Sequence, residues 1–212
     1  MQMFNKRKNL SEESNNTLEE QPLEEKENAL IEIVRFSIIA LIIVIPIRMF
    51  IAQPFIVSGE SMIETFQNGE YLIVDQVSYR FNEPKRGDVV IFRYPIDPSK
   101  FFIKRIIGLP GDEIIIKDDT ITIYNEKNPD GMVLDEPYIT PMTNSPDEKK
   151  ELGEREYFVM GDNRNHSSDS RAWGVLMEDR IIGRAILRLY PLQTLDYLPG
   201  ASEYTNVTSS SS

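Results

Sequence analysis

Three short segments of the sequence carry residue types that hydrolytic chemistry needs. The first, VSGESMIET at 57–65, holds Ser61 among small residues. The second, FFIKRIIGLPGD at 101–112, holds Lys104, and the third, GDNRNHSSDSR at 161–171, gathers hydroxyl, carboxylate and basic side chains. A serine hydroxyl becomes a good nucleophile only when a base removes its proton. A site built on Ser61 therefore needs a base beside it.

Histidine is the usual base, and the sequence has one, His166, in a loop rich in Ser, Asp and Asn that is typical of a solvated histidine. Lysine can take this role only when its amine is neutral near pH 7. That requires a pKa far below the ordinary value of about 10.4, usually through apolar burial. Read as a strand, 101–107 places Phe102 and Ile106 on the same face as Lys104. The pattern also fits a strand lysine that reaches to water, so it does not by itself identify the base.

Residues 54–200 are predicted to form one β-rich domain that positions these segments. Runs rich in β-branched and aromatic residues alternate with turns of Gly, Pro and Asp. The predicted strands cover residues 71–75, 88–93, 101–107, 113–117, 120–124, 157–160 and 181–190. Closely spaced short strands predict a mainly β fold, an antiparallel barrel or sandwich. The polar stretch 126–154 is predicted to be a loop excursion from that core.

A strongly hydrophobic stretch, residues 30–53, precedes this domain. Its uncharged part, 36–47, is shorter than the roughly 20 residues that usually span a bilayer, but the arginines at its two ends, Arg35 and Arg48, can reach the headgroups. The stretch lacks the small-residue ending of a cleaved signal peptide and the charged face of an interfacial helix. We expect an uncleaved transmembrane helix. Because no Lys or Arg lies between Arg48 and Arg80, the domain that follows is predicted to be extracytoplasmic, at the plasma membrane.

The composition excludes several other classes of function. The formal net charge of −11 argues against a nucleic-acid partner, because phosphate binding needs clustered Lys and Arg. The absence of cysteine and the single histidine exclude disulfides, thiol nucleophiles and multi-histidine metal sites. We expect no metal and no cofactor, and no obligate protein partner is evident. The acidic segment 1–29 and the segment 201–212 are predicted to be disordered tails, the first of them cytoplasmic.

Several motifs together resemble the successive conserved boxes of bacterial type I signal peptidases. In chain order they are SM with a threonine at 61–65, RGDVV leading to YP at 86–95, KR followed by GLPGD at 104–112, and GDNR with SSDSR at 161–171. One Ser-Met pair would carry no weight, whereas several boxes in order and at similar spacing do. The resemblance runs from the hydrophobic stretch to about Gly183.

This resemblance implies a function and a set of roles. It implies a membrane-bound serine endopeptidase that removes signal peptides from secreted preproteins, after small residues in an A-x-A-like pattern. Ser61 would be the nucleophile and Lys104 the general base. The supporting residues that it implies are Ser167, which orients the lysine, the ion pair of Asp169 with Arg171, and Asp162 behind the site.

The sequence departs from the family pattern at two positions. Many members have a serine two residues before the nucleophile, and its hydroxyl donates to the oxyanion. Here that position is Gly59, with Ser58 one residue further away, so Ser58 is a candidate second donor beside the backbone N–H of Ser61. Glu64 stands where the family usually has proline before Thr65, and because proline fixes the backbone, we expect a looser turn after the nucleophile.

Two other classes of protein share part of this pattern. A self-cleaving transcriptional repressor also uses a serine and a lysine on a related β fold, but it needs a DNA-binding domain where this chain has an acidic segment and a hydrophobic stretch. A catalytically silent, membrane-anchored binding module is the second alternative, to which Gly59 and Glu64 point. The joint presence of Ser61, Lys104 and Ser167 favours the enzyme.

Overall fold

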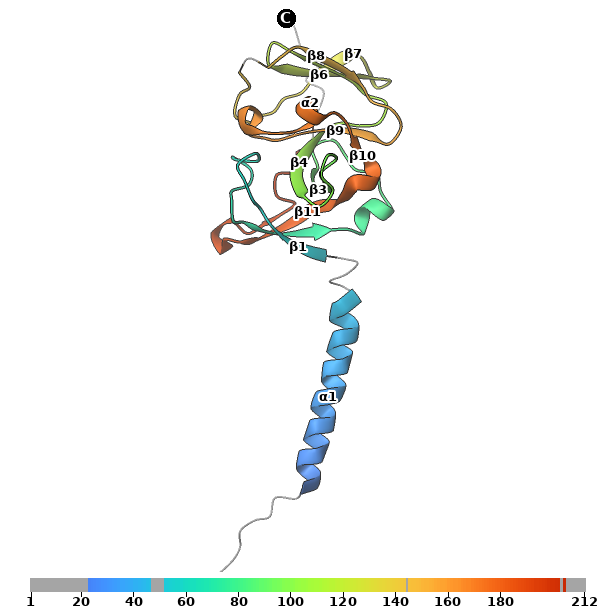
Figure 1. Cartoon of the computed structure of the whole chain (residues 1–212), viewed down its shortest axis with the longest axis vertical. Coiled ribbons are helices and arrows are strands. Elements are labelled where there is room, and N and C mark those ends of the chain that lie inside the picture. The colour runs from blue at the N-terminus through green and yellow to red at the C-terminus, as the bar shows by residue number, and fades with distance from the viewer. Residues whose placement is uncertain (1–22, 47–51, 144, 203, 205–212) are drawn as a thin grey trace, which may run out of the picture. The chain divides into compact units, whose positions relative to one another are not determined.

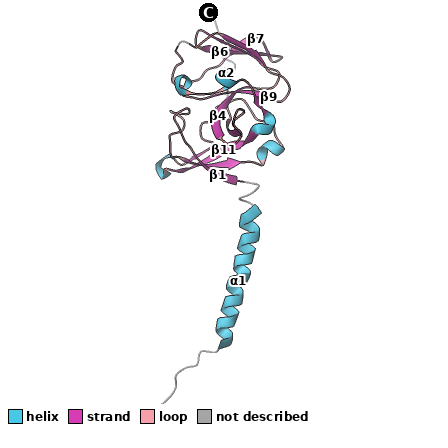
Figure 2. Cartoon of the chain, in the orientation of Figure 1, coloured by secondary structure: helices cyan, strands magenta, loops and turns pink. Residues whose placement is uncertain are grey.

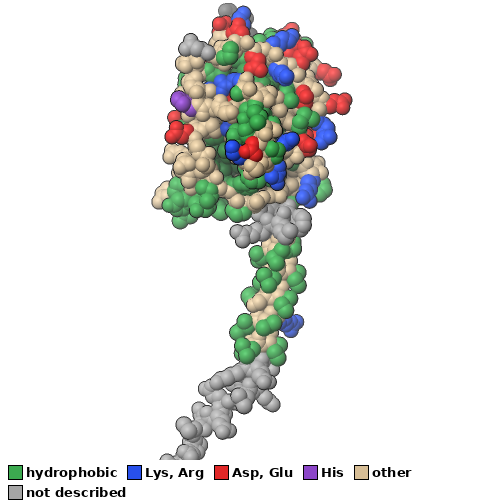
Figure 3. Space-filling view, viewed as in Figure 1, with side chains coloured by type: hydrophobic (Ala, Val, Ile, Leu, Met, Phe, Trp, Pro, Cys, Tyr) green, Lys and Arg blue, Asp and Glu red, His purple; other side chains and the backbone are tan. Residues whose placement is uncertain are grey.

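The computed structural model describes residues 23–46, 52–143, 145–202 and 204, and it divides into two units, Met1–Ile45 and Pro46–Ser212 (Figure 1). The first unit contains helix α1 (Leu23–Pro46). Its window Ala29–Pro46 has a mean hydropathy of 2.4 and none of it is buried, and hydrophobic side chains cover the helix in Figure 3. By length and composition, α1 can therefore cross a membrane.

Helix α1 differs at both ends from the predicted span of 30–53. It begins at Leu23, inside the predicted tail, because Leu, Glu and Lys are good helix formers; the rest of that tail, 1–22, lies outside the described residues. It ends at Pro46, which lacks the N–H that a continuing helix needs. Residues 52 and 53, predicted to be the end of the span, instead begin the edge strand 52–56, in which Pro54 is tolerated.

The second unit is mainly β, as predicted, with strands magenta in Figure 2. Its larger sheet has eight strands in the order β1-β2-β11-β3-β4-β9-β10, with β12 paired to β11, and every pair is antiparallel. The bounds are β1 (Ala52–Ile56), β2 (Tyr71–Asp75), β3 (Val89–Arg93), β4 (Phe101–Gly108), β9 (Glu156–Met160), β10 (Leu176–Met177), β11 (Ile181–Tyr190) and β12 (Asp196–Tyr197). Over the described residues the sheets are open and sandwich-like, so the predicted alternative of a closed barrel does not apply.

A smaller sheet is inserted between β4 and β9, which are neighbours in the larger one. Its order is β7-β6-β5-β8, and its strands are β5 (Glu113–Lys117), β6 (Thr120–Asn125), β7 (Asn128–Val133) and β8 (Glu148–Glu151). The predicted loop over 126–154 therefore contains two strands, β7 and β8. Met132 is the one buried residue among them, as expected for edge strands, so they lack the apolar alternation that identifies a half-buried strand.

Three clusters of buried apolar side chains hold this unit together. One lies under the smaller sheet, one packs Val90, Phe92 and Ile106 with Trp173, and one packs β2, β3 and β11 against residues 57–66. The remaining short elements are α2 (Ser170–Trp173) and the 3-10 turns η2 (Ser78–Arg80), η3 (Arg164–His166), η4 (Glu178–Arg180) and η5 (Leu192–Thr194). The cluster that packs against residues 57–66 matters most for function, because it fixes the segment that carries Ser61.

The end of the chain departs from the predicted tail of 201–212. Within that range the structure describes residues 201, 202 and 204, and Tyr204 packs beside the cluster under the smaller sheet. The hydroxyl of Tyr204 is hydrogen bonded to that of Tyr138. A lone tyrosine in a polar stretch gives no compositional sign of order, which explains the difference. Residues 205–212 lie outside the described residues.

Candidate active site

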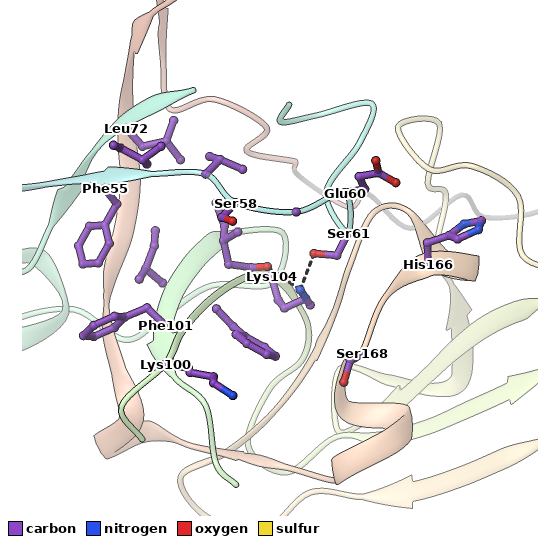
Figure 4. A pocket seen from close by; sticks show the side chains of 16 residues that line it. Phe55, Ser58, Glu60, Ser61, Leu72, Lys100, Phe101, Lys104, His166 and Ser168 are labelled. Atoms are coloured by element: carbon purple, nitrogen blue, oxygen red, sulfur yellow. Dashed lines mark hydrogen bonds between the residues drawn. The ribbon is translucent and has the colours of Figure 1, made fainter. Parts of the chain in front are cut away.

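Ser61 lies on a loop of residues 57–70, here called the nucleophile loop. Val57 and Gly69 close its neck, since Val57 N–H donates to Glu70 O at 2.9 Å and Gly69 N–H donates to Val57 O at 2.9 Å. Met62 and Phe66, 1% and 0% exposed, anchor it in the core. The side chain next to Ser61 is thus buried, whereas the Ser61 hydroxyl faces the cavity (Figure 4).

Lys104 lies in the middle of β4, where the register pairs it with Val90 of β3. The side chain is 3% exposed, and its Nζ lies 5.3 Å from the centre of the Phe102 ring, an apolar neighbour on the same face. Its Nζ donates to Ser61 Oγ at 2.7 Å and to Ile103 O at 2.9 Å (Figure 4). The structure thus brings together the two residues that the sequence selects for catalysis.

Burial lowers the pKa of Lys104 from 10.5 to about 8, because an ammonium loses hydration in this pocket. The charges of Asp169 and Asp162 act in the opposite direction and raise it. No carboxylate pairs directly with Lys104 in the part of the chain that the structure describes. With a pKa near 8, about a tenth of the lysine is neutral at pH 7, enough to act as a base.

The next residue on β4, Arg105, points to the opposite side and is fully buried. Its Nε and Nη2 donate to the two carboxylate oxygens of Asp162 at 2.8 and 2.6 Å. Asp162 also accepts a hydrogen bond of 2.5 Å from the hydroxyl of Thr65, four residues after the nucleophile. Asp162 therefore supports the far end of the nucleophile loop, on the side away from Lys104.

The third segment, 161–171, turns back on itself around Asp169. The Asp169 carboxylate accepts from Arg171 Nε and Nη2, both at 2.8 Å, and from the backbone N–H of Gly161 at 3.1 Å. The hydroxyl of Ser167 is buried and has no hydrogen-bond partner among the described residues. A Cβ on Gly161 would lie 2.3 Å from Ser167 Oγ and 2.4 Å from Ser61 O, so this hydroxyl lies close to the nucleophile's backbone.

Comparison with known proteins agrees with this arrangement. The family described as "Signal peptidase, peptidase S26" matches residues 30–190, about three quarters of the chain. This chain belongs to that family.

Two relatives, from Synechocystis and Bacillus subtilis, agree with this family match. "Probable signal peptidase I-2" of Synechocystis is 35% identical over 84% of this chain and 81% of its own length. "Signal peptidase I T" of Bacillus subtilis is 34% identical over 86% of this chain and 97% of its own. A solved signal peptidase I from Enterococcus faecalis is 30% identical, covers 49% of this chain and 97% of its own, and has a TM-score of 0.42. Since the first two matches extend over most of both sequences, they include the nucleophile loop, β4 and the third segment.

Asn163 is a residue for which the sequence suggested no role. Its backbone N–H donates to Ser61 O at 3.0 Å, and its side-chain amide donates to Glu60 O at 3.0 Å. Asn163 therefore binds the carbonyl groups of the two peptides that flank Ser61. Its place in the GDNR motif was the available signal, but a pattern of residue types does not indicate which backbone a side chain will reach.

The two family departures have clear structural counterparts. Gly59 has a φ of +101°, in the region that favours glycine, and its N–H donates to Asn68 Oδ1 at 3.1 Å. Ser58 is exposed and lines the cavity before Ser61 in Figure 4. His166 lies on the opposite rim, exposed, with Nδ1 3.3 Å from Asn163 Oδ1, and does not contact Ser61.

Glu64 has a φ of +74°, which proline cannot adopt because its ring fixes φ near −65°. The turn after the nucleophile is therefore built differently from one with proline. It is also held firmly, since Thr65 O accepts from Arg188 Nη2 at 2.8 Å and Thr65 N–H donates to Met62 O at 2.9 Å. These contacts fix Thr65 at the end of the turn, and the looser turn stays a prediction.

A cavity of about 440 Å³ opens beside Ser61 and Lys104 (Figure 4). On one side of the dyad its wall is apolar, and on the other side Glu60, His166 and Ser168 form a polar rim. The apolar wall comes from the β1 strand, β2, β3 and β4 and consists of Phe55, Ile56, Leu72, Ile91, Phe101, Phe102 and Ile103. The cavity can take small apolar side chains while leaving a backbone carbonyl within reach of Ser61.

Proposed function

We propose that this protein is a signal peptidase I, a membrane-bound serine endopeptidase that removes signal peptides from secreted preproteins with Ser61 and Lys104 as its dyad. The observation that carries the proposal is the 2.7 Å contact between Lys104 Nζ and Ser61 Oγ at a buried lysine whose pKa is lowered to about 8. A serine and a base within hydrogen-bond reach form the unit that nucleophilic catalysis requires.

The reaction begins when neutral Lys104 removes the proton of Ser61 and Oγ attacks the carbonyl carbon of the scissile peptide. The oxyanion forms near the backbone N–H of Ser61, with the Ser58 hydroxyl as candidate second donor. Protonated Lys104 then gives its proton to the leaving amine, and the acyl-enzyme remains. A water molecule loses a proton to Lys104, attacks the ester and releases the carboxylic acid, which restores Ser61 and Lys104.

The supporting residues keep Lys104 and Ser61 in this geometry. Ser167 offers a buried hydroxyl without a partner among the described residues, and we assign it to the lysine amine that changes its protonation state during the cycle. The pair of Asp169 with Arg171 fixes the turn that carries Ser167, while Asp162 holds Thr65 from behind. None of these residues takes up or releases a proton in the proposed cycle.

The substrate is the end of a secretory signal peptide with small side chains before the cut. The apolar wall of the cavity suits small apolar side chains of this kind. An extended peptide beside the strands near Ser61 would gain backbone hydrogen bonds, with alternate side chains entering the cavity.

The bilayer is the second proposed partner. Helix α1 is the anchor, and the scarcity of Lys and Arg after it supports an extracytoplasmic peptidase domain at the plasma membrane. The β-rich unit exposes large apolar side chains at the end of β11 and beyond, where hydrophobic residues gather in Figure 3; these are Tyr190, Leu192, Leu195 and Tyr197. An exposed apolar patch of this kind is typical of a membrane or protein contact.

The test uses the full chain, purified in detergent, and a preprotein substrate. We expect wild-type protein to release the mature product, and Ser61→Ala and Lys104→Ala each to lower kcat by at least ~10³-fold, because each removes half of the dyad. His166→Ala serves as the matched control, since His166 lies on the same cavity without touching Ser61. A silent binding module would release no product, and activity that survives Lys104→Ala would overturn the dyad.

The pH dependence gives an independent check on the base. Because the neutral form of Lys104 is the active one, kcat/KM of the wild-type protein should rise about tenfold between pH 7 and pH 9, with a midpoint near 8. A midpoint above 10 would mean that the base has an ordinary lysine pKa.

A further inference from the structure

The segment that follows β12 is packed against the reverse side of the active-site strand. Residues 200–202 and 204, here called the C-terminal strap, lie beyond residue 190, where the match to the family ends. Arg105 Nη1 donates to Gly200 O and, at 3.2 Å, to Ser202 Oγ. At the end of the strap, Tyr204 is hydrogen bonded through its hydroxyl to that of Tyr138. The strap thus contacts the residue next to Lys104.

Two glycines permit this close approach. A Cβ on Gly87 would lie 1.9 Å from Ser202 O, so no other residue type fits there without moving the strap. A Cβ on Gly200 would lie 2.3 Å from Thr65 Cγ2, which shows that the strap touches the nucleophile loop directly. Gly200 also has a φ of +72°, which favours glycine on its own account.

The strap completes the surroundings of Arg105. Apart from the strap, Arg105 has two other partners. Its Nε and Nη2 donate to Asp162, and its Nη1 donates to Gly87 O at 3.0 Å. The guanidinium carbon lies 3.8 Å from the centre of the Tyr138 ring, the same ring that the strap reaches through Tyr204. Without the strap, Nη1 would lose two of its three acceptors, Gly200 O and Ser202 Oγ, and the Arg105–Asp162 pair would lose one side of its packing.

We propose that the C-terminal strap is a positioning element for the nucleophile. It keeps Arg105 paired with Asp162 and packs against Thr65. The nucleophile loop therefore keeps Ser61 at hydrogen-bond distance from Lys104. This inference rests on the proposed function, since it concerns the same dyad. A displacement of Ser61 by about 1 Å can cost roughly 10²-fold in rate without weakening substrate binding. The strap therefore acts on kcat.

Two truncations of the full chain test this role. One ends at Pro199 and removes the strap, and the other ends at Tyr204 and keeps it. With a preprotein in detergent, we expect the Pro199 truncation to lose at least tenfold in kcat with KM changed less than twofold. The Tyr204 truncation should match the wild type. Equal kcat for the two truncations at a temperature where circular dichroism shows both folded would overturn the proposal.

A matched pair of substitutions covers the case in which the shorter chain fails to fold. Gly200→Ala and Gly111→Ala both place alanine at a positive φ, +72° and +81°, but a Cβ on Gly111 meets nothing within 4 Å. We expect Gly200→Ala to lower kcat and Gly111→Ala to leave it unchanged. Adding Thr65→Ser to Gly200→Ala removes the methyl group that the new Cβ meets and keeps the hydroxyl that Asp162 binds, so it should restore kcat.

The outcomes distinguish failure of the proposed function from failure of the role proposed for the strap. If the wild-type chain releases no mature product, the proposed function fails and the strap has no catalytic role to play. If the wild type is active and Gly200→Ala loses only melting temperature, with kcat per folded molecule unchanged, the strap is a stabilising contact and the inference is wrong. Failure of Thr65→Ser to restore kcat would also contradict it.

Discussion

Lys104 and Arg105 are neighbours on β4, both are cations and both are buried, yet the structure treats them in opposite ways. Arg105 meets a carboxylate through two hydrogen bonds of 2.6 and 2.8 Å, a backbone carbonyl and an aromatic ring. Lys104 meets a hydroxyl, a carbonyl and the face of Phe102. One side of the strand therefore stabilises a charge and the other side opposes it.

This difference separates an anchor from a base. A buried ion pair with complete hydrogen bonding stays ionised, so Arg105 holds its position at all relevant pH values. A buried lysine without a carboxylate partner releases its proton more easily, and its pKa falls to about 8. Because β-strand side chains alternate between faces, a single strand delivers both environments within two residues.

The largest expected effect comes from breaking the anchor. Asp162→Asn leaves Arg105 buried without its counter-charge, which should lower the free energy of unfolding by about 3–5 kcal/mol. The control is Glu178→Gln, which removes an exposed pair with Arg155 at 2.9 Å and should leave the free energy of unfolding nearly unchanged, because solvent screens exposed pairs. Urea denaturation of the full chain measures both, and similar losses for the two variants would contradict the anchor role.

Replacing the base, Lys104, should raise the free energy of unfolding, whereas Asp162→Asn lowers it. At pH 7 the fall in pKa from 10.5 to about 8 means that burying the Lys104 ammonium opposes folding by about 3 kcal/mol. Lys104→Met keeps the volume of the side chain and removes this cost. The loss of the hydrogen bonds to Ser61 Oγ and Ile103 O, in turn, destabilises the folded variant by about 1 kcal/mol each. We expect an inactive variant whose free energy of unfolding is about 1 kcal/mol higher than that of the wild type.

The pH dependence of this gain checks its cause. Between pH 8 and 10.5 the unfolded wild-type chain holds a proton on Lys104 that the folded chain has released, so wild-type stability rises with pH across that window. The advantage of Lys104→Met should therefore shrink as the pH rises through the window and change sign at about pH 9, where the remaining cost of burying the ammonium equals the loss of the two hydrogen bonds. A difference between the two proteins that stays constant from pH 7 to 10 would show that burial of charge is not its source.

The same comparison shows how far the sequence alone can lead. All seven predicted strands are present, because burial of apolar and β-branched side chains leaves a local pattern. The side-chain alternation of 101–107 also placed Lys104 and Arg105 on opposite faces. However, the carboxylate that distinguishes them belongs to Asp162, 57 positions away from Arg105. Contacts over such separations depend on sheet order, as do the edge strands β7 and β8 and the packing of Tyr204, and no local pattern encodes them.

Glu64 lies between Ser61, which contacts the base Lys104, and Thr65, which contacts Asp162 of the anchor. Substitution of Glu64 by glycine should have the smallest effect on stability. A non-glycine residue at a φ of +74° carries a backbone strain of about 1–2 kcal/mol. Glu64→Gly relieves the strain but makes the unfolded chain more flexible, at about 0.5–1 kcal/mol, so the net stabilisation should be about 0.5 kcal/mol.

Glu60→Gly is the matched control, because it removes the same charge from the same loop at a residue without a positive φ. It should destabilise the protein slightly in the same urea measurement. Glu64→Pro should lower kcat, since proline forces the turn between Ser61 and Thr65 into another conformation. If Glu64→Pro is as active as the wild type, the left-handed turn does not set the link between nucleophile and anchor. The strain at Glu64 would then have no part in holding Ser61 against Lys104.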